Sequence, residues 1–244
     1  MAEAAPTLSI VIPAYNEEHR LPRALEAAVR FCEGRHVNYQ LIVVDDGSTD
    51  RTREVADGFV REGYPVEVLR NGANRGKGYA VRVGGLAARG RFVLLADADL
   101  STPIEEILRL LPWAQAGTPV VIGSRKVPGA QILRHQPAWR EWMGKVFGVL
   151  ARRLLVPEVA DFTCGFKLFR QDWVGPLFRR LRRDDWTYDA ELLYVARRLG
   201  LAIKEVPVTW ENDPDSRVRP LRAAARSLCG LLAIRLNGLL GRYN

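Results

Sequence analysis

Two aspartates one residue apart, Asp97 and Asp99, carry the oxygen atoms of this sequence best suited to metal chemistry. They follow the apolar run 92–95, which is typical of a buried strand, and precede 102–105 (Thr-Pro-Ile-Glu), which predicts a helix with Thr as its N-cap. Two carboxylates at such a strand end would hold Mg²⁺ or Mn²⁺ against a diphosphate. The alternative is that they only end a strand and cap a turn.

Further residues able to bind a ligand stand after other predicted strands or at helix starts. They are Tyr15, Glu17, Asp46 and Lys77, so an aromatic ring, carboxylates and a cation would converge on one cleft. Each also has a plain structural explanation, such as covering a sheet end or favouring a helix start. The loop 74–78 (Asn-Arg-Gly-Lys-Gly) lacks the spacing and the hydroxyl residue of a nucleotide-binding P-loop.

Alternating strands and helices are expected to position these residues. Apolar runs predict strands at 8–13, 40–46, 66–69 and 92–95, and segments with helical apolar spacing separate them. This alternation predicts a doubly wound, mostly parallel sheet of the α/β class. The strand-end loops would then gather at one edge of the sheet, where such folds bind ligands.

Composition predicts one domain with a C-terminal extension. A chain of 244 residues with 48% hydrophobic content can bury one sizeable core, and we expect a domain at 1–218 and an amphipathic helix at 219–244. Thirty-six basic against 28 acidic residues give a net charge of +8, which favours a phosphorylated substrate, an anionic membrane or a nucleic acid. The three cysteines are widely spaced, which argues against a disulfide framework or a zinc site.

The sequence also predicts a location. The first six residues lack the basic and apolar regions of a signal peptide. The longest charge-free apolar runs, such as 227–234, fall far short of the roughly 20 residues that span a bilayer. We therefore expect a cytoplasmic protein whose contact with membranes, if it has one, is peripheral.

Five short motifs, in this order and spacing, resemble glycosyltransferase family 2, whose members have the GT-A fold. Together they cover most of the first 125 residues. The motifs are 10–17 (Ile-Val-Ile-Pro-Ala-Tyr-Asn-Glu), 43–50 (Val-Val-Asp-Asp-Gly-Ser-Thr-Asp), 74–78, 96–99 (Ala-Asp-Ala-Asp) and 122–125 (Ile-Gly-Ser-Arg).

That resemblance implies a donor site for a nucleotide sugar. Asp97 and Asp99 would bind the divalent metal and the diphosphate, and Ala98 would line the pocket between them. The metal would neutralise charge that develops on the departing nucleoside diphosphate. The residues that would hold the base and ribose are Pro13, Tyr15, Glu17, Val44 and Asp46, and Lys77 is assigned to the same donor site.

The second half resembles the polyprenyl-phosphate hexosyltransferases within that family. The segments 161–170, 188–193, 205–207 and 213–217 extend the likeness to about residue 219. Ser101 stands where the mannose-transferring members keep a metal-binding Gln, so the likeness is closer to the glucosyl branch.

The same likeness assigns residues to the acceptor and to a closing loop. Arg125 and Arg140 would face the acceptor phosphate, since arginine offers forked donors for that task. Ser216 and Arg217 match a loop that would close over the donor phosphates.

The acceptor decides the mechanism, and Asp189 separates two cases. A lipid monophosphate is already a dianionic nucleophile at neutral pH and needs placing more than deprotonation. A sugar hydroxyl would instead need a base, and Asp189 stands where other family members keep it. The structural alternative for Asp189 is an acid in the first turn of a helix. We expect direct in-line attack by a lipid phosphate, with inversion.

Two basic amphipathic segments suggest a membrane surface. The region 134–155 mixes Trp139, Trp142 and Phe147 with arginines and a lysine, as at a membrane–water interface. In 219–243 an apolar stripe that includes Leu228, Leu232, Leu236, Leu239 and Tyr243 has arginines on both flanks. The alternative for both is packing on the domain itself or on a dimer partner.

The sequence thus favours an inverting, metal-dependent enzyme that moves glucose from UDP-glucose to a polyprenyl or dolichyl phosphate. The alternatives are mannosyl transfer from GDP-mannose to the same lipid, and transfer to a saccharide hydroxyl. A hypothesis of another class is a non-catalytic module that binds a nucleotide sugar or nucleic acid. Nucleic acid is disfavoured because Asp46, Asp97 and Asp99 would repel its phosphates. The hexose, the base and the oligomeric state stay open.

Overall fold

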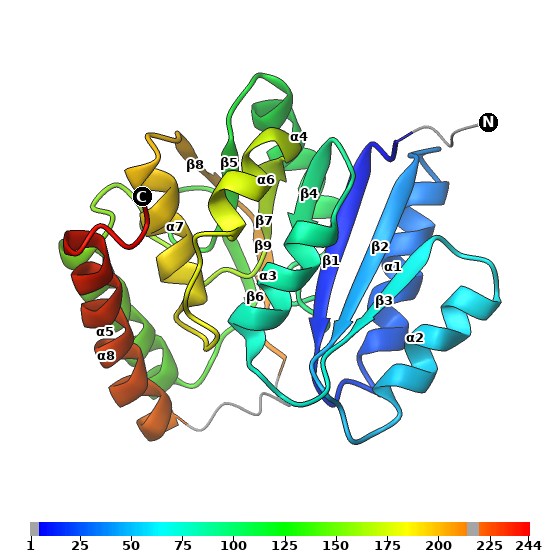
Figure 1. Cartoon of the computed structure of the whole chain (residues 1–244), viewed down its shortest axis with the longest axis horizontal. Helices are drawn as coiled ribbons and strands as arrows, with labels where there is room; N and C mark the ends of the chain where they lie inside the picture. Colours follow the sequence, from blue (N-terminus) through cyan, green and yellow to red (C-terminus); the bar gives the residue numbers. More distant parts are fainter. Residues whose placement is uncertain (1–4, 214–219) are drawn as a thin grey trace.

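The computed structural model describes residues 5–213 and 220–244, and the side chains among them except those of 220–226. Its centre is a seven-stranded sheet with the strand order β3-β2-β1-β4-β7-β5-β8 (Figure 1). Six strands run in one direction, and β7 runs antiparallel between β4 and β5. The strands are β1 (Leu8–Ala14), β2 (Tyr39–Asp45), β3 (Val66–Arg70), β4 (Phe92–Leu95), β5 (Val120–Ser124), β7 (Lys167–Arg170) and β8 (Ile203–Pro207).

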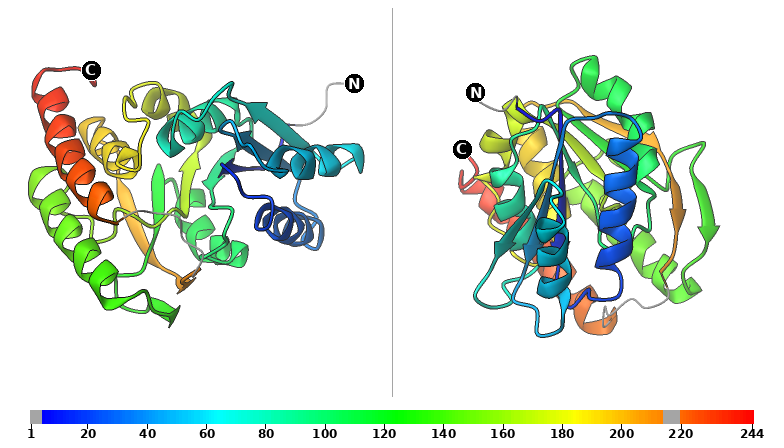
Figure 2. Two further views of the ribbon diagram at one scale, coloured as in Figure 1. Left: turned by 90° about the horizontal axis from the view of Figure 1, so that it is seen from below. Right: turned by 90° about the vertical axis from the view of Figure 1, so that its right-hand side faces the viewer.

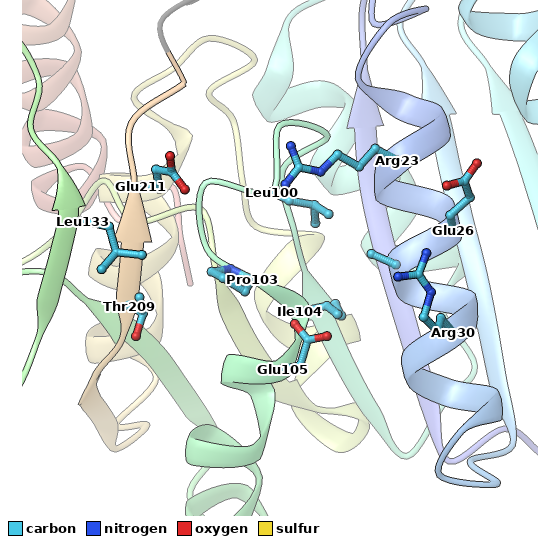
Figure 3. Close-up of a pocket in the computed structure, with 11 residues that line it drawn as sticks. Arg23, Glu26, Arg30, Leu100, Pro103, Ile104, Glu105, Leu133, Thr209 and Glu211 are labelled. Atoms are coloured by element: carbon cyan, nitrogen blue, oxygen red, sulfur yellow. The ribbon is translucent and has the colours of Figure 1, made fainter.

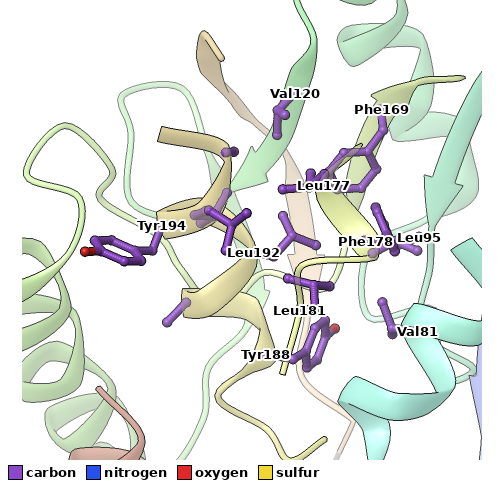
Figure 4. Packing of buried hydrophobic residues seen from close by; sticks show 14 of the residues in the cluster. Val81, Leu95, Val120, Phe169, Leu177, Phe178, Leu181, Tyr188, Leu192 and Tyr194 are labelled. Atoms are coloured by element: carbon purple, nitrogen blue, oxygen red, sulfur yellow. The ribbon is translucent and has the colours of Figure 1, made fainter. Parts of the chain in front are cut away.

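The central strands are buried on both faces because helices cover both sides of the sheet. Successive residues of β1 alternate between two cores: Val11 packs with α3, α6 and α7, whereas Ile12 packs with α1, α2 and α4. Figure 4 shows the first core, where Phe178, Leu181 and Leu192 close over the sheet. The helices are α1 (Leu21–Glu33), α2 (Thr52–Arg61), α3 (Lys77–Ala87), α4 (Ile107–Gln115), α6 (Gln171–Phe178) and α7 (Tyr188–Arg198), with a short 3₁₀ helix at Ile104–Glu106.

The four strands expected in the first half are confirmed, but the predicted helix start after the aspartates is displaced. Pro103 is extended, with ψ 144°, and the 3₁₀ helix begins at Ile104 without a side-chain cap. The Thr102 hydroxyl lies 4.0 Å from the Cys164 sulfur instead of capping the helix. The chain therefore leaves the strand as an extended loop, which keeps Asp97 and Asp99 at the sheet edge.

Two long helices, α5 (Ala138–Leu154) and α8 (Pro220–Leu239), lie side by side at one end of the molecule (Figures 1 and 2). A small parallel sheet of β6 (Gln131–Arg134) and β9 (Thr209–Glu211) stands apart from the main sheet. Leu231 and Ile234 of α8 enter the first core, while Leu232 and Leu236 face outward. Among the described residues, no helix combines the length and apolar run that crossing a bilayer requires.

Candidate active site

The acid pair lies in the loop that leaves β4 at the carboxyl edge of the parallel strands. Asp99 accepts a hydrogen bond from the Ser101 amide at 2.9 Å, and Leu100 takes a positive φ of 48°. Asp97 Oδ1 lies 2.6 Å from Nζ of Lys77, the first residue of α3. A cation at a helix N-terminus opposes the helix dipole. Its position is stabilised by Asp97, so two distant motifs meet here as the sequence predicts.

The electrostatics of the pair favour a divalent cation. Burial by itself would raise the pKa of Asp97, but the charge and hydrogen bond of Lys77 outweigh burial and lower this pKa below its ordinary value. Burial, and then the charge of Asp97, raise the pKa of Asp99. The second carboxylate therefore lacks enough positive charge around it. A hard divalent cation would supply that charge, and carboxylate oxygens are ligands it prefers.

Two protein carboxylates, those of Asp97 and Asp99, are available as metal ligands. The described residues contain no cluster of three or more acidic, histidine or cysteine side chains suited to a metal. Mg²⁺ is commonly held by one or two carboxylates together with substrate phosphates and water. The residues present therefore fit a metal that is bound together with a diphosphate.

Asp46, one of the expected donor residues, organises the loop before α3. Its side chain is buried, and Oδ2 accepts from the Gly76 amide at 2.7 Å while Oδ1 accepts from Nδ2 of Asn71 at 2.6 Å. An added Cβ on Gly47 would come within 2.6 Å of the Ala73 carbonyl carbon, so this turn needs glycine. Asp46 thereby fixes the backbone from which Lys77 extends.

The other residues expected to bind the nucleotide sugar differ in how far they are buried. Tyr15 is exposed at the sheet edge, whereas the Val44 side chain is fully buried beneath α3, and Pro13 and Ala98 are largely covered. Glu17 forms a two-bond ion pair with Arg20, at 2.5 and 2.7 Å. Ser216 and Arg217 lie outside the described residues.

On the acceptor side, Arg125 follows β5 and is held by Asp161. Its Nε and Nη2 bond the two carboxylate oxygens at 2.7 and 2.8 Å, and the Trp210 ring centre is 5.1 Å away. Burial alone would raise the pKa of Asp161, but Arg125 holds that pKa far below its ordinary value. Arg140 lies on α5, 5.4 Å from the centre of the Trp139 ring. Arg125 is thus a fixed cation, and Arg140 lies on a separate helix.

Asp189 lies in the first turn of α7 and pairs with a lysine that the sequence reasoning did not single out. Lys167, the first residue of β7, is fully buried and places Nζ 2.5 Å from Asp189 Oδ1. Burial raises the pKa of Asp189 above its ordinary value, and the opposing charges of Lys167 and Lys77 do not offset this effect. A lysine inside the apolar run 166–169 was the available signal, because a buried charge requires a partner.

A pocket of about 310 Å³ opens beside the acid loop (Figure 3). It lies between α1 and the β6–β9 sheet, and its lining includes Leu100 and Leu133 together with Arg23, Arg30 and Glu211. Neither Asp97 nor Asp99 lines it. This pocket is therefore adjacent to the acid pair but is not the site that the pair forms.

Comparisons with known proteins identify what this arrangement is similar to. A family model described as Glycosyl transferase family 2 matches residues 9–178. The dolichyl-phosphate beta-glucosyltransferase of Drosophila melanogaster is 38% identical over 228 residues, which cover 87% of this chain and 69% of that protein. The proteins of the same name from Mus musculus and Homo sapiens are each 34% identical, over 97% of this chain and 77% of theirs.

Solved structures show the same fold at lower identity. Glucosyl-3-phosphoglycerate synthase from Mycobacterium tuberculosis, in complex with phosphoglyceric acid, superposes with a TM-score of 0.70 at 21% identity. Its complex with Mn²⁺, UDP-glucose and glycerol 3-phosphate gives a TM-score of 0.69 at 22% identity. Each match covers 94% of this chain and 80% of that one.

Proposed function

This chain belongs to glycosyl transferase family 2, and we propose that it transfers glucose from UDP-glucose to dolichyl phosphate or a related polyprenyl phosphate. It is a glycosyltransferase with an α/β fold of the GT-A type. The observation that carries the proposal is the acid pair at the end of β4, with Lys77, Arg125 and Lys167 around it. The acceptor and the glucosyl group follow from the names of the relatives. UDP-glucose as the donor is supported by a structural neighbour solved with that molecule.

The proposed donor site lies around the acid pair. Asp97 and Asp99 would hold Mg²⁺ or Mn²⁺, which would supply charge neutralisation for the departing diphosphate. Complexes of the structural neighbour contain Mn²⁺ together with UDP-glucose. The remaining proposed donor contacts are Pro13, Tyr15, Glu17, Val44, Asp46, Lys77, Ala98, Ser216 and Arg217.

The proposed reaction is a single displacement with inversion. An oxygen of the lipid phosphate forms the bond to the anomeric carbon, the bond from that carbon to the UDP oxygen breaks, and UDP leaves. Arg125 and Arg140 orient the incoming dianion, which needs no base. The Lys167–Asp189 pair favours this route over a hydroxyl acceptor, because the carboxylate that would act as base is already engaged.

We propose that the helices α5 and α8 dock the enzyme on the cytoplasmic face of a membrane. The outer face of α5 exposes Trp139 and Trp142, and that of α8 exposes Leu232, Leu236 and Leu239. Exposed cations lie among them, and the sequence of α8 contains no acidic residue. An apolar face bordered by cations fits anionic lipid. Residues 1–218 would then be the catalytic domain and 219–244 the lipid-facing helix.

The test is an activity assay on the purified chain. UDP-glucose and GDP-mannose are each supplied with polyprenyl phosphate and Mg²⁺ or Mn²⁺, and lipid-linked sugar is measured. We expect product from UDP-glucose and loss of product when the metal is chelated. Product from GDP-mannose alone would contradict the proposed donor, and transfer only to a saccharide hydroxyl would contradict the proposed acceptor.

A further inference from the structure

Lys167 is a buried cation that takes no direct part in the proposed displacement. It opens the one antiparallel strand of the main sheet, and in register it faces Leu95 on β4 and Ile122 on β5. Because β7 runs against its neighbours, its first residue lies at the same edge as the acid pair. Nζ donates to Oδ1 of Asp189 at 2.5 Å and to the carbonyl oxygen of Cys164. The side chain has no exposed surface.

This pairing engages the Asp189 carboxylate, although burial leaves the pKa of Asp189 raised. A general base must offer its carboxylate to the acceptor hydroxyl and become neutral when it takes the proton. If Asp189 became neutral, the ammonium of Lys167 would stay buried, with the carbonyl oxygen of Cys164 as its hydrogen-bond partner and Asp97 as the nearby acidic charge. An uncompensated buried charge is strongly unfavourable.

Lys167 also holds the segment 161–166 against the acid pair. An added Cβ on Gly165 would lie 2.2 Å from Asp97 Oδ2, so this segment touches the carboxylate directly. Arg125 fixes one end of the segment through Asp161, and Lys167 fixes the other through Cys164. The two cations therefore set how closely the segment approaches Asp97.

We propose that Lys167 is a positioning residue: it removes Asp189 from proton transfer and holds the 161–166 segment on Asp97, so the site takes acceptors that arrive already ionised. The proposal rests on the proposed transfer to a lipid phosphate and specifies its acceptor class. The step itself moves no proton from the acceptor to Asp189, because the attacking phosphate oxygen is already charged.

The experiment compares Lys167→Met, Asp189→Asn and the double variant with polyprenyl phosphate as acceptor. We expect Lys167→Met to lower kcat on the order of 100-fold, as displacement of aligned reacting groups does, with the KM for UDP-glucose changed less than about threefold. Asp189→Asn should keep at least about a tenth of kcat, because Lys167 still holds Cys164 and a phosphate needs no base.

The double variant separates positioning from a purely structural role. It leaves no unpaired buried charge, so its Tm should recover from the lower values of the single variants. Its kcat should stay as low as that of Lys167→Met. Recovery of kcat together with Tm would overturn the proposal, as would loss of activity in Asp189→Asn with activity kept in Lys167→Met.

Two controls keep the outcomes distinct. Lys204→Met removes another strand lysine, which packs on Trp113 with its Nζ 4.1 Å from the ring centre, and should leave kcat unchanged. Wild-type enzyme is also given an uncharged polyprenol. Transfer only to the alcohol would contradict the proposed function, whereas normal lipid-phosphate transfer with an unimpaired Lys167→Met variant would contradict this inference alone.

Discussion

The proposed metal site depends on single side chains at the acid pair. The ammonium group of Lys77 pairs with Asp97. The pKa of the neighbouring Asp99 stays raised. A divalent cation would supply the positive charge that this pair lacks.

Replacing both acids by Asn should abolish turnover. Loss of a metal that stabilises developing charge by several kcal/mol corresponds to a fall of about 10³-fold or more. Initial rates at saturating Mn²⁺ and calorimetric titration of Mn²⁺ with UDP would measure both effects. Asp57→Asn, which removes a carboxylate of α2 paired with Arg70, is the control and should change neither. Full activity in the double variant would exclude the proposed metal site.

Asp161→Asn should destabilise the fold, because it leaves Arg125 without its buried partner. Removing one partner of a buried ion pair costs about 3–5 kcal/mol. Urea unfolding of both proteins at pH 7 would measure the difference.

The same pair has a definite pH dependence. Since the folded pKa of Asp161 lies below its unfolded value, its stabilisation is complete above the ordinary value near 4 and is lost as pH falls toward the folded pKa. The gap between wild type and Asp161→Asn should therefore be constant from pH 7 to about 5 and shrink below about 4. A gap that shrinks between pH 7 and 5 would assign it to another group.

Among the elements, the antiparallel strand β7 contributes most to the geometry of the candidate site. Its reversed direction brings the residues before it, 161–166, to the edge where the other strands end. Gly165 is the point of closest approach, since a methyl group there would overlap Asp97.

Gly165→Ala should therefore lower activity through Asp97. We expect kcat to fall about 100-fold, the effect of roughly 1 Å of misplacement, with a smaller loss of Mn²⁺ affinity. Gly144→Ala in α5 is the matched control because an added methyl there meets no atom within 4 Å. It should leave kcat unchanged and stabilise the helix by up to about 1 kcal/mol. Equal effects of the two changes on kcat would contradict the contact.

At the scale of the whole molecule, α8 both completes the core and exposes leucines. Leu231 and Ile234 are buried, and Tyr243, expected on the apolar stripe, is buried as well and donates to Oε1 of Glu191 at 2.6 Å. The expected outward stripe is therefore shorter at its C-terminal end, where it stops at Leu239, the last residue of α8. Removing the helix would expose the core, so surface substitutions are the sharper test of docking.

Changing Leu232 and Leu236 to Ser should weaken binding to anionic vesicles while leaving Tm nearly unchanged. Both side chains are about half exposed, at 53% and 54%, so they contribute little to the core. Each buried leucine side chain is worth roughly 1.5–3 kcal/mol in an apolar environment. Flotation with vesicles containing anionic lipid would measure the loss. Equal flotation of variant and wild type would exclude this face, and binding insensitive to salt would argue against the cations.

The sequence by itself determined the features that depend on residues close together in the chain. Apolar runs ending in acidic or glycine-rich turns fixed four strands, from β1 to β4, and placed Asp46 and Asp97 at their ends. Parallel strands end at one edge, so the meeting of Lys77 with Asp97 followed from the pattern. The family motifs are likewise short runs of consecutive residues, so they can be recognised without the tertiary structure.

Only the tertiary structure decided which charges pair. Lys167 and Asp189 are 22 residues apart, and Arg125 and Asp161 are 36 apart. Their contacts depend on the insertion of β7 between β4 and β5, which the short apolar run of β7 does not encode. The sequence could not show which residues of α8 are buried for the same reason, because their burial depends on the helices that pack against α8. Pairing across distant elements is a property of strand order and packing, and no local pattern specifies it.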